Sequence, residues 1–194
     1  MNDAHLYPAR ALQPPKGRGF WVFGYGSLMW RPGFPFVEAL PALLHGYHRA
    51  FCIESTHYRG NSETPGLVLG LDRGGACRGR AYRVDAAQAE AVARYLHERE
   101  MVGGVYEPHW LKIQTSKGLR TAAAYVADRQ NPQYAGKLPE ARIVAAIRRG
   151  VGIAGTNRDY LRNTVRHLDQ LGIADGPLHR LLKLVDADQA GVVP

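Results

Sequence analysis

The stretch that decides the fold lies between residues 22 and 30 and reads Val22-Phe23-Gly24-Tyr25-Gly26-Ser27-Leu28-Met29-Trp30. Its first residues belong to an aromatic and β-branched run over residues 20–23, which is typical of a short buried strand. This run leads directly into a Gly-Tyr-Gly-Ser loop. Glycines at a strand end can adopt positive φ angles and allow the backbone to approach a ligand closely. Such a loop can point several N–H groups at an anion or an oxyanion.

Length and composition indicate one globular domain. The chain has 194 residues, of which 45% are hydrophobic, enough for a sizeable core. We expect a single domain over residues 20–194. Residues 1–19 are rich in proline and basic residues and lack the apolar segment of a secretory signal, so we expect a mobile N-terminal extension. No apolar run approaches the roughly 18 residues that span a membrane, so we expect no membrane partner.

Cysteine and charge usage favour a cytoplasmic protein without nucleic-acid partners. Cys52 and Cys77 form neither a Cys-x-x-Cys motif nor a metal-binding spacing, which predicts two buried, reduced thiols. The formal charge is +8, but the basic residues are scattered, with Arg148-Arg149 the only adjacent pair of Lys or Arg. No aromatic platform accompanies them, so we predict a generally basic surface that attracts a small anionic substrate.

The pattern of strands and helices predicts an α+β fold. Strand-like runs precede and follow a helix over residues 86–99 that is capped by Asp85. Further helices are expected over 140–149, from Thr156 to about 172, and after Pro177. Two glycine-containing connections, residues 72–75 and 116–118, are expected to form hairpins. We predict a mixed, mostly antiparallel sheet curled into a β-barrel and flanked by helices. Its strands are expected over residues 20–23, 49–53, 67–71, 77–84, 110–114 and 120–126.

Glu100 is the best catalytic candidate on helical phase. At about 100° per residue, Glu100 lies within roughly 20° of Ala89 and Ala93 on the apolar face, whereas Glu98 is turned about 140° away. A carboxyl at the end of a buried face should have a raised pKa, because burial disfavours its charged form. A general base needs that property. The alternative is a structural carboxylate that is ion-paired with one of three arginines, Arg94, Arg99 or Arg59.

Other catalytic motifs are missing. Ser27 follows Gly26 directly, so the loop does not fit the Gly-x-Ser-x-Gly nucleophile elbow. The loop also lacks the third glycine of a dinucleotide-binding motif. The eight histidines show no His-Glu-x-x-His pattern or other paired spacing. We therefore expect no metal site.

An ordered set of motifs resembles the ChaC-like family of γ-glutamylcyclotransferases, in particular its glutathione-specific branch. The resemblance covers residues 21–184. The markers stand in the order Val22 to Pro32, Phe51-Cys52, Ser55, Arg59-Gly60, Pro65-Gly66-Leu67, Gly74-Gly75, Cys77, Gly79, Ala81-Tyr82-Arg83, Tyr95-Leu96, Arg99-Glu100-Met101, Asn131-Pro132, Tyr134, Gly136, Asn157 and Tyr160-Leu161.

The resemblance implies a reaction and a site. The implied substrate is glutathione, cleaved to 5-oxoproline and cysteinylglycine by attack of its own amine, with no cofactor. The family's catalytic glutamate falls on Glu100, and its substrate-binding loop falls on Tyr25, Gly26, Ser27 and Leu28. Arg59 is expected either to pair with a substrate carboxylate or to hold its own Arg-Gly loop. Tyr125 and Tyr134 are expected either to line the pocket or simply to pack.

Two alternatives remain beside this expectation. One is a cyclotransferase for other γ-glutamyl amines, such as γ-glutamyl-lysine. The other is a non-catalytic module that binds γ-glutamyl groups. The position of Glu100 within the Arg-Glu-Met segment favours the glutathione-cleaving enzyme over both.

Overall fold

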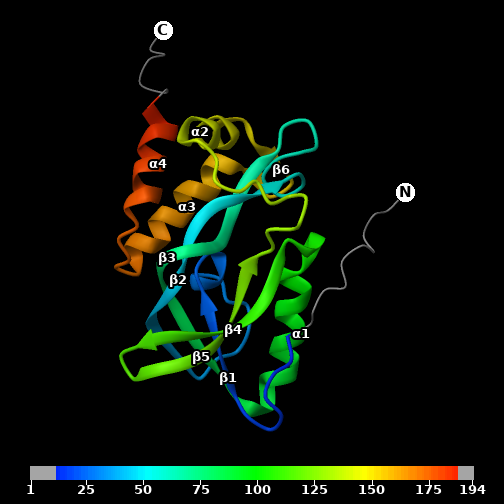
Figure 1. Ribbon diagram of the computed structural model, residues 1–194, viewed down its shortest axis with the longest axis vertical. Helices are drawn as coiled ribbons and strands as arrows, with labels where there is room; N and C mark the ends of the chain where they lie inside the picture. Colours follow the sequence, from blue (N-terminus) through cyan, green and yellow to red (C-terminus); the bar gives the residue numbers. More distant parts are fainter. Residues whose placement is uncertain (1–11, 188–194) are drawn as a thin grey trace, which may run out of the picture. The chain divides into compact units, whose positions relative to one another are not determined.

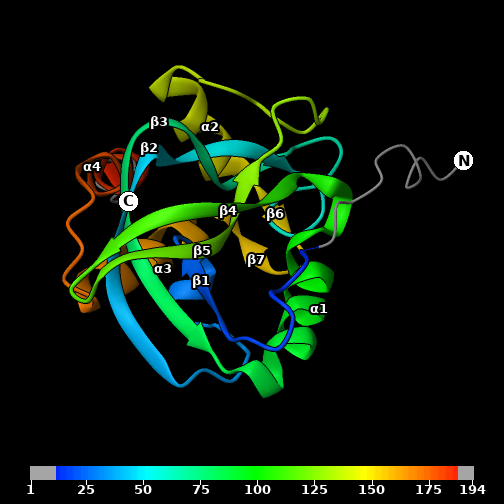
Figure 2. The same ribbon diagram turned by 60° about the horizontal axis from the view of Figure 1, so that its bottom comes forward.

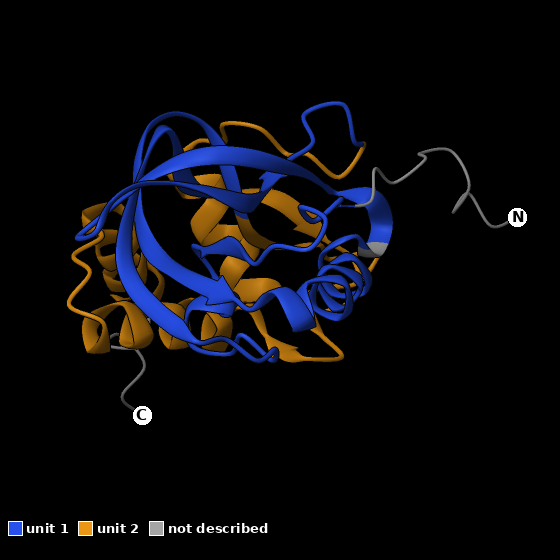
Figure 3. Cartoon of the chain, turned by 90° about the horizontal axis from the view of Figure 1, so that it is seen from below, with its two compact units in different colours: residues 1–50, 70–131 blue, residues 51–69, 132–194 orange. Residues whose placement is uncertain are grey.

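The computed structural model describes residues 12–187, which form two compact units. Among the described residues, unit 1 comprises residues 12–50 and 70–131, and unit 2 comprises residues 51–69 and 132–187 (Figure 3). Most of the predicted N-terminal extension lies outside the described residues. Within its described part, Leu12 is only 6% exposed and belongs to the hydrophobic core of unit 1.

The sheet is a closed barrel with the strand order β1-β3-β2-β4-β5 (Figure 1). Strand β1 pairs antiparallel with β3 and parallel with β5, while β4 pairs antiparallel with β2 and β5. This arrangement confirms the predicted mixed, mostly antiparallel barrel. The strands are β1 Phe20–Gly24, β2 Glu38–Ser55, β3 Gly66–Val84, β4 Tyr106–Thr115 and β5 Gly118–Ala127.

Of the two predicted hairpins, one is confirmed and one is wrong. Strands β4 and β5 turn at Ser116-Lys117, with Gly118 at φ 88° (Figure 2). At Gly74 and Gly75 the chain instead continues within β3, although both residues have positive φ. A hairpin needs the two flanking segments to pair with each other. Here the second segment pairs with β1, from Gly24 opposite Arg80 to Phe20 opposite Val84.

Close backbone contact between β1 and β3 depends on Gly79. A Cβ atom at this position would lie 2.3 Å from the carbonyl oxygen of Gly24 and 2.7 Å from the ring of Phe23. Any side chain would therefore push β3 away from the end of β1. The glycine keeps the strand that precedes the Gly-Tyr-Gly-Ser loop tightly packed.

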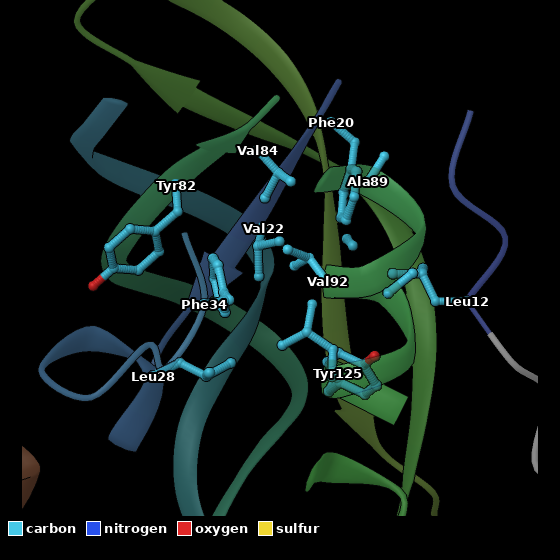
Figure 4. Packing of buried hydrophobic residues seen from close by; sticks show 13 residues of the cluster. Leu12, Phe20, Val22, Leu28, Phe34, Tyr82, Val84, Ala89, Val92 and Tyr125 are labelled. Atoms are coloured by element: carbon cyan, nitrogen blue, oxygen red, sulfur yellow. The ribbon is translucent and has the colours of Figure 1, made fainter. Parts of the chain in front are cut away.

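Helix α1, Ala89–Glu100, packs its apolar face on the barrel strands of unit 1. A 3-10 turn, Ala86–Gln88 (η2), precedes it, and the Asp85 side chain caps this turn as predicted by accepting from Ala87 N. The buried helix residues lie in one cluster with residues of β1, β3 and β5 (Figure 4). The cluster comprises Leu12, Phe20, Val22, Leu28, Phe34, Tyr82, Val84, Ala89, Val92, Ala93, Leu96, Ala123 and Tyr125.

Unit 2 contains three helices, α2 Glu140–Arg149, α3 Asn157–Gln170 and α4 Gly176–Asp186, and the short pair β6 Val151–Gly152 and β7 Gly155–Thr156. The predicted cap of α3 is confirmed, because the Thr156 hydroxyl oxygen accepts from Asp159 N at 3.0 Å. Helix α4 begins slightly earlier than predicted, since Asp175 caps it by accepting from Leu178 N. No helix within residues 12–187 is long and apolar enough to cross a membrane.

Replacing Leu96 by alanine should destabilise the protein by about 2–5 kcal/mol, because this side chain is fully buried and would leave a cavity between α1 and the barrel. Chemical denaturation would measure the loss. The exposed Glu98 on the same helix provides the control, and Glu98→Ala should change stability by no more than about 0.5 kcal/mol. Equal effects of the two substitutions would contradict the observed packing of α1.

Candidate functional site

The loop that follows β1 turns through a 3-10 helix, Ser27–Met29 (η1). Met29 N donates to Gly26 O at 2.9 Å, and Arg31 N donates to Ser27 O at 2.8 Å. The two glycines of this loop do not use the positive φ that glycine allows: Gly26 has φ −122°, and Gly24 is not among the glycines with positive φ. The physical reason is that a 3-10 turn reverses the chain with negative φ angles, so no left-handed residue is needed.

Side chains from the barrel hold the carbonyl groups of this loop. The buried Arg49 of β2 donates from Nε to Tyr25 O, and from Nη2 to Arg78 O at 2.7 Å. The hydroxyl of Tyr82 donates to Met29 O at 2.6 Å. The loop is therefore tied to the barrel by its main-chain oxygens at both ends of the turn.

The N–H groups of Ser27 and Leu28 begin the 3-10 turn. The first N–H groups of a helical turn have no acceptor within that turn. Arg49 and Tyr82 already donate to the carbonyl oxygens of Tyr25 and Met29. The main-chain groups that the loop can still offer to a ligand are therefore N–H donors. The Leu28 side chain is buried in the core, so only its main chain can serve a ligand.

Glu100 is the last residue of α1, and its side chain is 16% exposed. Burial raises the pKa of its carboxyl above the ordinary value, and the positive charge of Arg99 only partly opposes this effect. The Nε atom of Arg99 lies 3.1 Å from Glu100 Oε1. Helical phase thus correctly placed Glu100 on the buried side and Glu98 in solvent. The ion pair considered as an alternative also exists, with Arg99 as the partner.

Tyr125 of β5 places a buried hydroxyl in the same unit. The residue is 1% exposed, and no hydrogen-bond partner for its hydroxyl is found among the described residues. Burial, and secondarily the negative charge of Glu100, raise the pKa of Tyr125. The phenol therefore stays protonated at neutral pH and is available as a hydrogen-bond donor.

Arg99 is the residue that sequence reasoning missed as a part of the site. Its Nη2 donates to Ser27 Oγ at 3.0 Å, and its Nη1 donates to Arg31 O, Pro32 O and the Tyr95 hydroxyl at 2.6, 3.1 and 2.8 Å. The sequence signals were its place in the Arg99-Glu100-Met101 motif and its candidacy as an ion-pair partner of Glu100. Contacts with residues about 70 positions away leave no periodic pattern in the chain.

Gly33 makes this arrangement possible. It has φ 72°, and a Cβ atom there would lie 2.0 Å from the Tyr95 hydroxyl oxygen. A side chain at residue 33 would thus separate the loop from α1 at the point where Arg99 joins them.

Two predicted site residues, Arg59 and Tyr134, belong to unit 2. Arg59 Nη1 donates to Ala154 O at 2.5 Å and to Thr156 O at 3.3 Å, and its guanidinium lies over the ring of Tyr160. These contacts correspond to the structural role considered for Arg59. Tyr134 forms a bridge with Ile53 at the end of β2. Substrate contacts of these two residues stay a prediction.

Cys52 and Cys77 are buried and free, as predicted. Within residues 12–187, no three His, Cys, Asp or Glu side chains are grouped as metal ligands.

Comparison with known proteins points to one family. The model of the family described as ChaC-like protein matches residues 20–188. The chain is 37% identical over 183 residues to the glutathione-specific gamma-glutamylcyclotransferase of Escherichia coli (strain K12), covering 94% of this chain and 79% of that protein. It is 35% identical over 193 residues to glutathione-specific gamma-glutamylcyclotransferase 1 of Homo sapiens, covering 93% of this chain and 85% of that protein.

A solved structure shares the fold. The crystal structure of a yeast gamma-glutamyl cyclotransferase specific to glutathione matches with a TM-score of 0.80 and 23% identity, over 88% of this chain and 96% of the yeast chain. Because the match extends over most of both chains, it confirms the predicted fold class.

Glu100→Gln should stabilise the folded protein at neutral and alkaline pH. A carboxyl whose pKa is higher in the folded state binds more protons there, so stability falls as pH rises from the unfolded pKa through the folded one. Glutamine resembles the protonated form and removes this loss. Denaturation curves between pH 4 and 9 would show wild type losing stability relative to the variant. A stability difference between wild type and Glu100→Gln that does not change with pH would contradict the raised pKa of Glu100. Glu98→Gln serves as the control.

Proposed function

This chain belongs to the ChaC-like family, and we propose that it is an enzyme that cleaves glutathione to 5-oxoproline and cysteinylglycine. The observation that carries the proposal is a buried carboxyl with a raised pKa, Glu100, linked through Arg99 to a loop whose first N–H groups can bind an oxyanion. Relatives that are named for this activity align with most of the chain, which supports the same reaction here.

Glu100 acts as general base in the first step. Its carboxylate takes one proton from the α-ammonium group of the γ-glutamyl residue, which leaves a neutral amine with a free electron pair. The raised pKa brings the base closer to the pH at which it works, so that it can later return the proton. The attacking amine and the γ-carbonyl belong to the same molecule, so the enzyme mainly has to hold the chain in a folded, reactive conformation.

Ring closure places negative charge on the γ-carbonyl oxygen. The amine nitrogen forms a bond to the γ-carbon and closes a five-membered ring. We assign the developing oxyanion to the N–H groups of Ser27 and Leu28, which begin the 3-10 turn of the loop. Tyr25 and Gly26 shape this loop through their main chain, and the Tyr125 hydroxyl donates a further hydrogen bond near Glu100.

Collapse of the tetrahedral intermediate completes the reaction. The bond between the γ-carbon and the cysteinyl nitrogen breaks, and Glu100 returns its proton to the leaving amine. The cationic ring nitrogen gives up its second proton to the same amine, which leaves as an ammonium group, and the ring becomes a neutral lactam. The products are 5-oxoproline and cysteinylglycine, and neither water nor a redox partner enters the balance. The amide bond is replaced by the lactam of the product.

Glu100→Gln should lower turnover of glutathione about 100-fold or more, because glutamine keeps the side-chain volume but accepts no proton. Formation of 5-oxoproline would be followed by mass spectrometry, with circular dichroism to establish that the variant is folded. Glu98→Gln, two residues away on the exposed side of α1, is the matched control and should retain activity. Loss of activity in the control but not in Glu100→Gln would show that the base has been misassigned.

Glutathione should be a better substrate than γ-glutamyl-lysine. The relatives are named for glutathione, and a basic surface favours glutathione, which is a net anion, over γ-glutamyl-lysine, whose second ammonium group makes it neutral overall. Values of kcat/KM for the two compounds would decide. Comparable values would indicate a cyclotransferase for γ-glutamyl amines in general, and binding without any 5-oxoproline would indicate a non-catalytic module.

A further inference from the structure

The hydrogen bonds of Arg99 fix two hydroxyl oxygens, those of Ser27 and Tyr95, as acceptors. An arginine side chain is always a donor and never an acceptor. Ser27 Oγ, 3.0 Å from Nη2, and Tyr95 Oη, 2.8 Å from Nη1, must therefore both accept from Arg99. Each hydroxyl keeps its own proton for another partner.

For Ser27, no such partner occurs in the described part of the chain: its only side-chain hydrogen bond there is the one from Arg99. The hydroxyl lies in the same turn whose first N–H groups are assigned to the oxyanion. A donor at this place adds to the N–H groups of Ser27 and Leu28. The turn then presents only donors to a negatively charged group.

We propose that Arg99 is a positioning residue that joins the Ser27 loop to Glu100 and directs the Ser27 hydroxyl proton towards the substrate. This inference rests on the proposed function for the identity of the substrate. The same guanidinium holds Arg31 O and Pro32 O, so it clamps the loop on both sides of its turn. Its Nε remains 3.1 Å from Glu100 Oε1, so one rigid group sets the distance between oxyanion donors and base.

Lysine cannot reproduce the hydrogen-bonding geometry of Arg99. A guanidinium offers five N–H donors in one plane, whereas an ammonium offers three around one atom. A lysine at residue 99 would retain the positive charge beside Glu100 but could not also reach Ser27, Arg31 and Pro32. Charge and geometry can therefore be separated by two variants.

The charge of Arg99 also affects the protonation of Glu100. The groups that act on this carboxyl electrostatically are Arg99 on α1 and Tyr125 on β5. Tyr125 is neutral at the working pH, so Arg99 is the charge that opposes the effect of burial. Loss of this charge should move the acidic limb of the pH profile to higher pH.

The test compares Arg99→Lys, Arg99→Met and Ser27→Ala, together with a double variant that combines Arg99→Met with Ser27→Ala. Both Arg99 variants should raise KM for glutathione about tenfold or more, as loss of a hydrogen bond to a charged group implies. Only Arg99→Met should shift the acidic limb of kcat/KM to higher pH. The double variant should be no worse than the poorer single variant, because both changes remove one shared interaction.

Arg94→Met is the matched control, since Arg94 lies exposed on the same helix. It should keep the wild-type KM and pH profile. Multiplying effects of Arg99→Met and Ser27→Ala would overturn the proposed coupling. An unchanged KM in Arg99→Lys would overturn the role of the guanidinium geometry.

Two measurements separate this inference from the proposed function. Titration of Glu100 by ¹³C NMR should give a higher pKa in Arg99→Met than in wild type, and hydrogen exchange at the amides of Met29 and Arg31 should be faster. Both readouts need no substrate. If wild type makes no 5-oxoproline from glutathione, the proposed function fails while these two results still decide the positioning role. Unchanged titration and exchange would overturn it.

Discussion

Burial of the apolar face of α1 against β1, β3 and β5 is the interaction on which the candidate site depends. Leu96 and its neighbours hold the helix against the barrel, so the last turn of the helix ends beside the loop that follows β1. Arg99 and Glu100 come to the loop as a consequence of this packing. A few apolar contacts thereby bring together residues that are about 70 positions apart in the chain.

Glu100 is held at a cost to stability. Burial raises its pKa, which means that the ionised form is less favourable in the folded protein than in water. If Glu100 served only a structural ion pair, we would expect the charge of Arg99 to outweigh burial and to lower the pKa of the carboxyl. The net upward direction is the property expected of a group that must accept and then release a proton.

In the proposed mechanism, the loop after β1 presents main-chain donors to an anion. Arg49, Tyr82 and Arg99 together engage carbonyl oxygens at Tyr25, Met29, Arg31 and Pro32. Side chains from outside the loop donate to its carbonyl oxygens. The main-chain N–H groups of the loop therefore remain for a ligand. Donors that are preorganised in this way need no rearrangement during the reaction.

The sequence by itself determined the element types, the helix caps at Asp85 and Thr156, the barrel class and the buried side of α1, because hydrophobic periodicity and capping are local. The choice of Glu100 as the catalytic candidate followed from that periodicity. Tertiary structure alone decided that Gly74 and Gly75 continue a strand, since pairing of β3 with β1 is non-local. It also decided that the Gly26 loop turns with negative φ and that Arg99 joins Ser27 to Glu100. Hydrogen bonds between distant residues depend on distances in space, and no spacing along the chain encodes them.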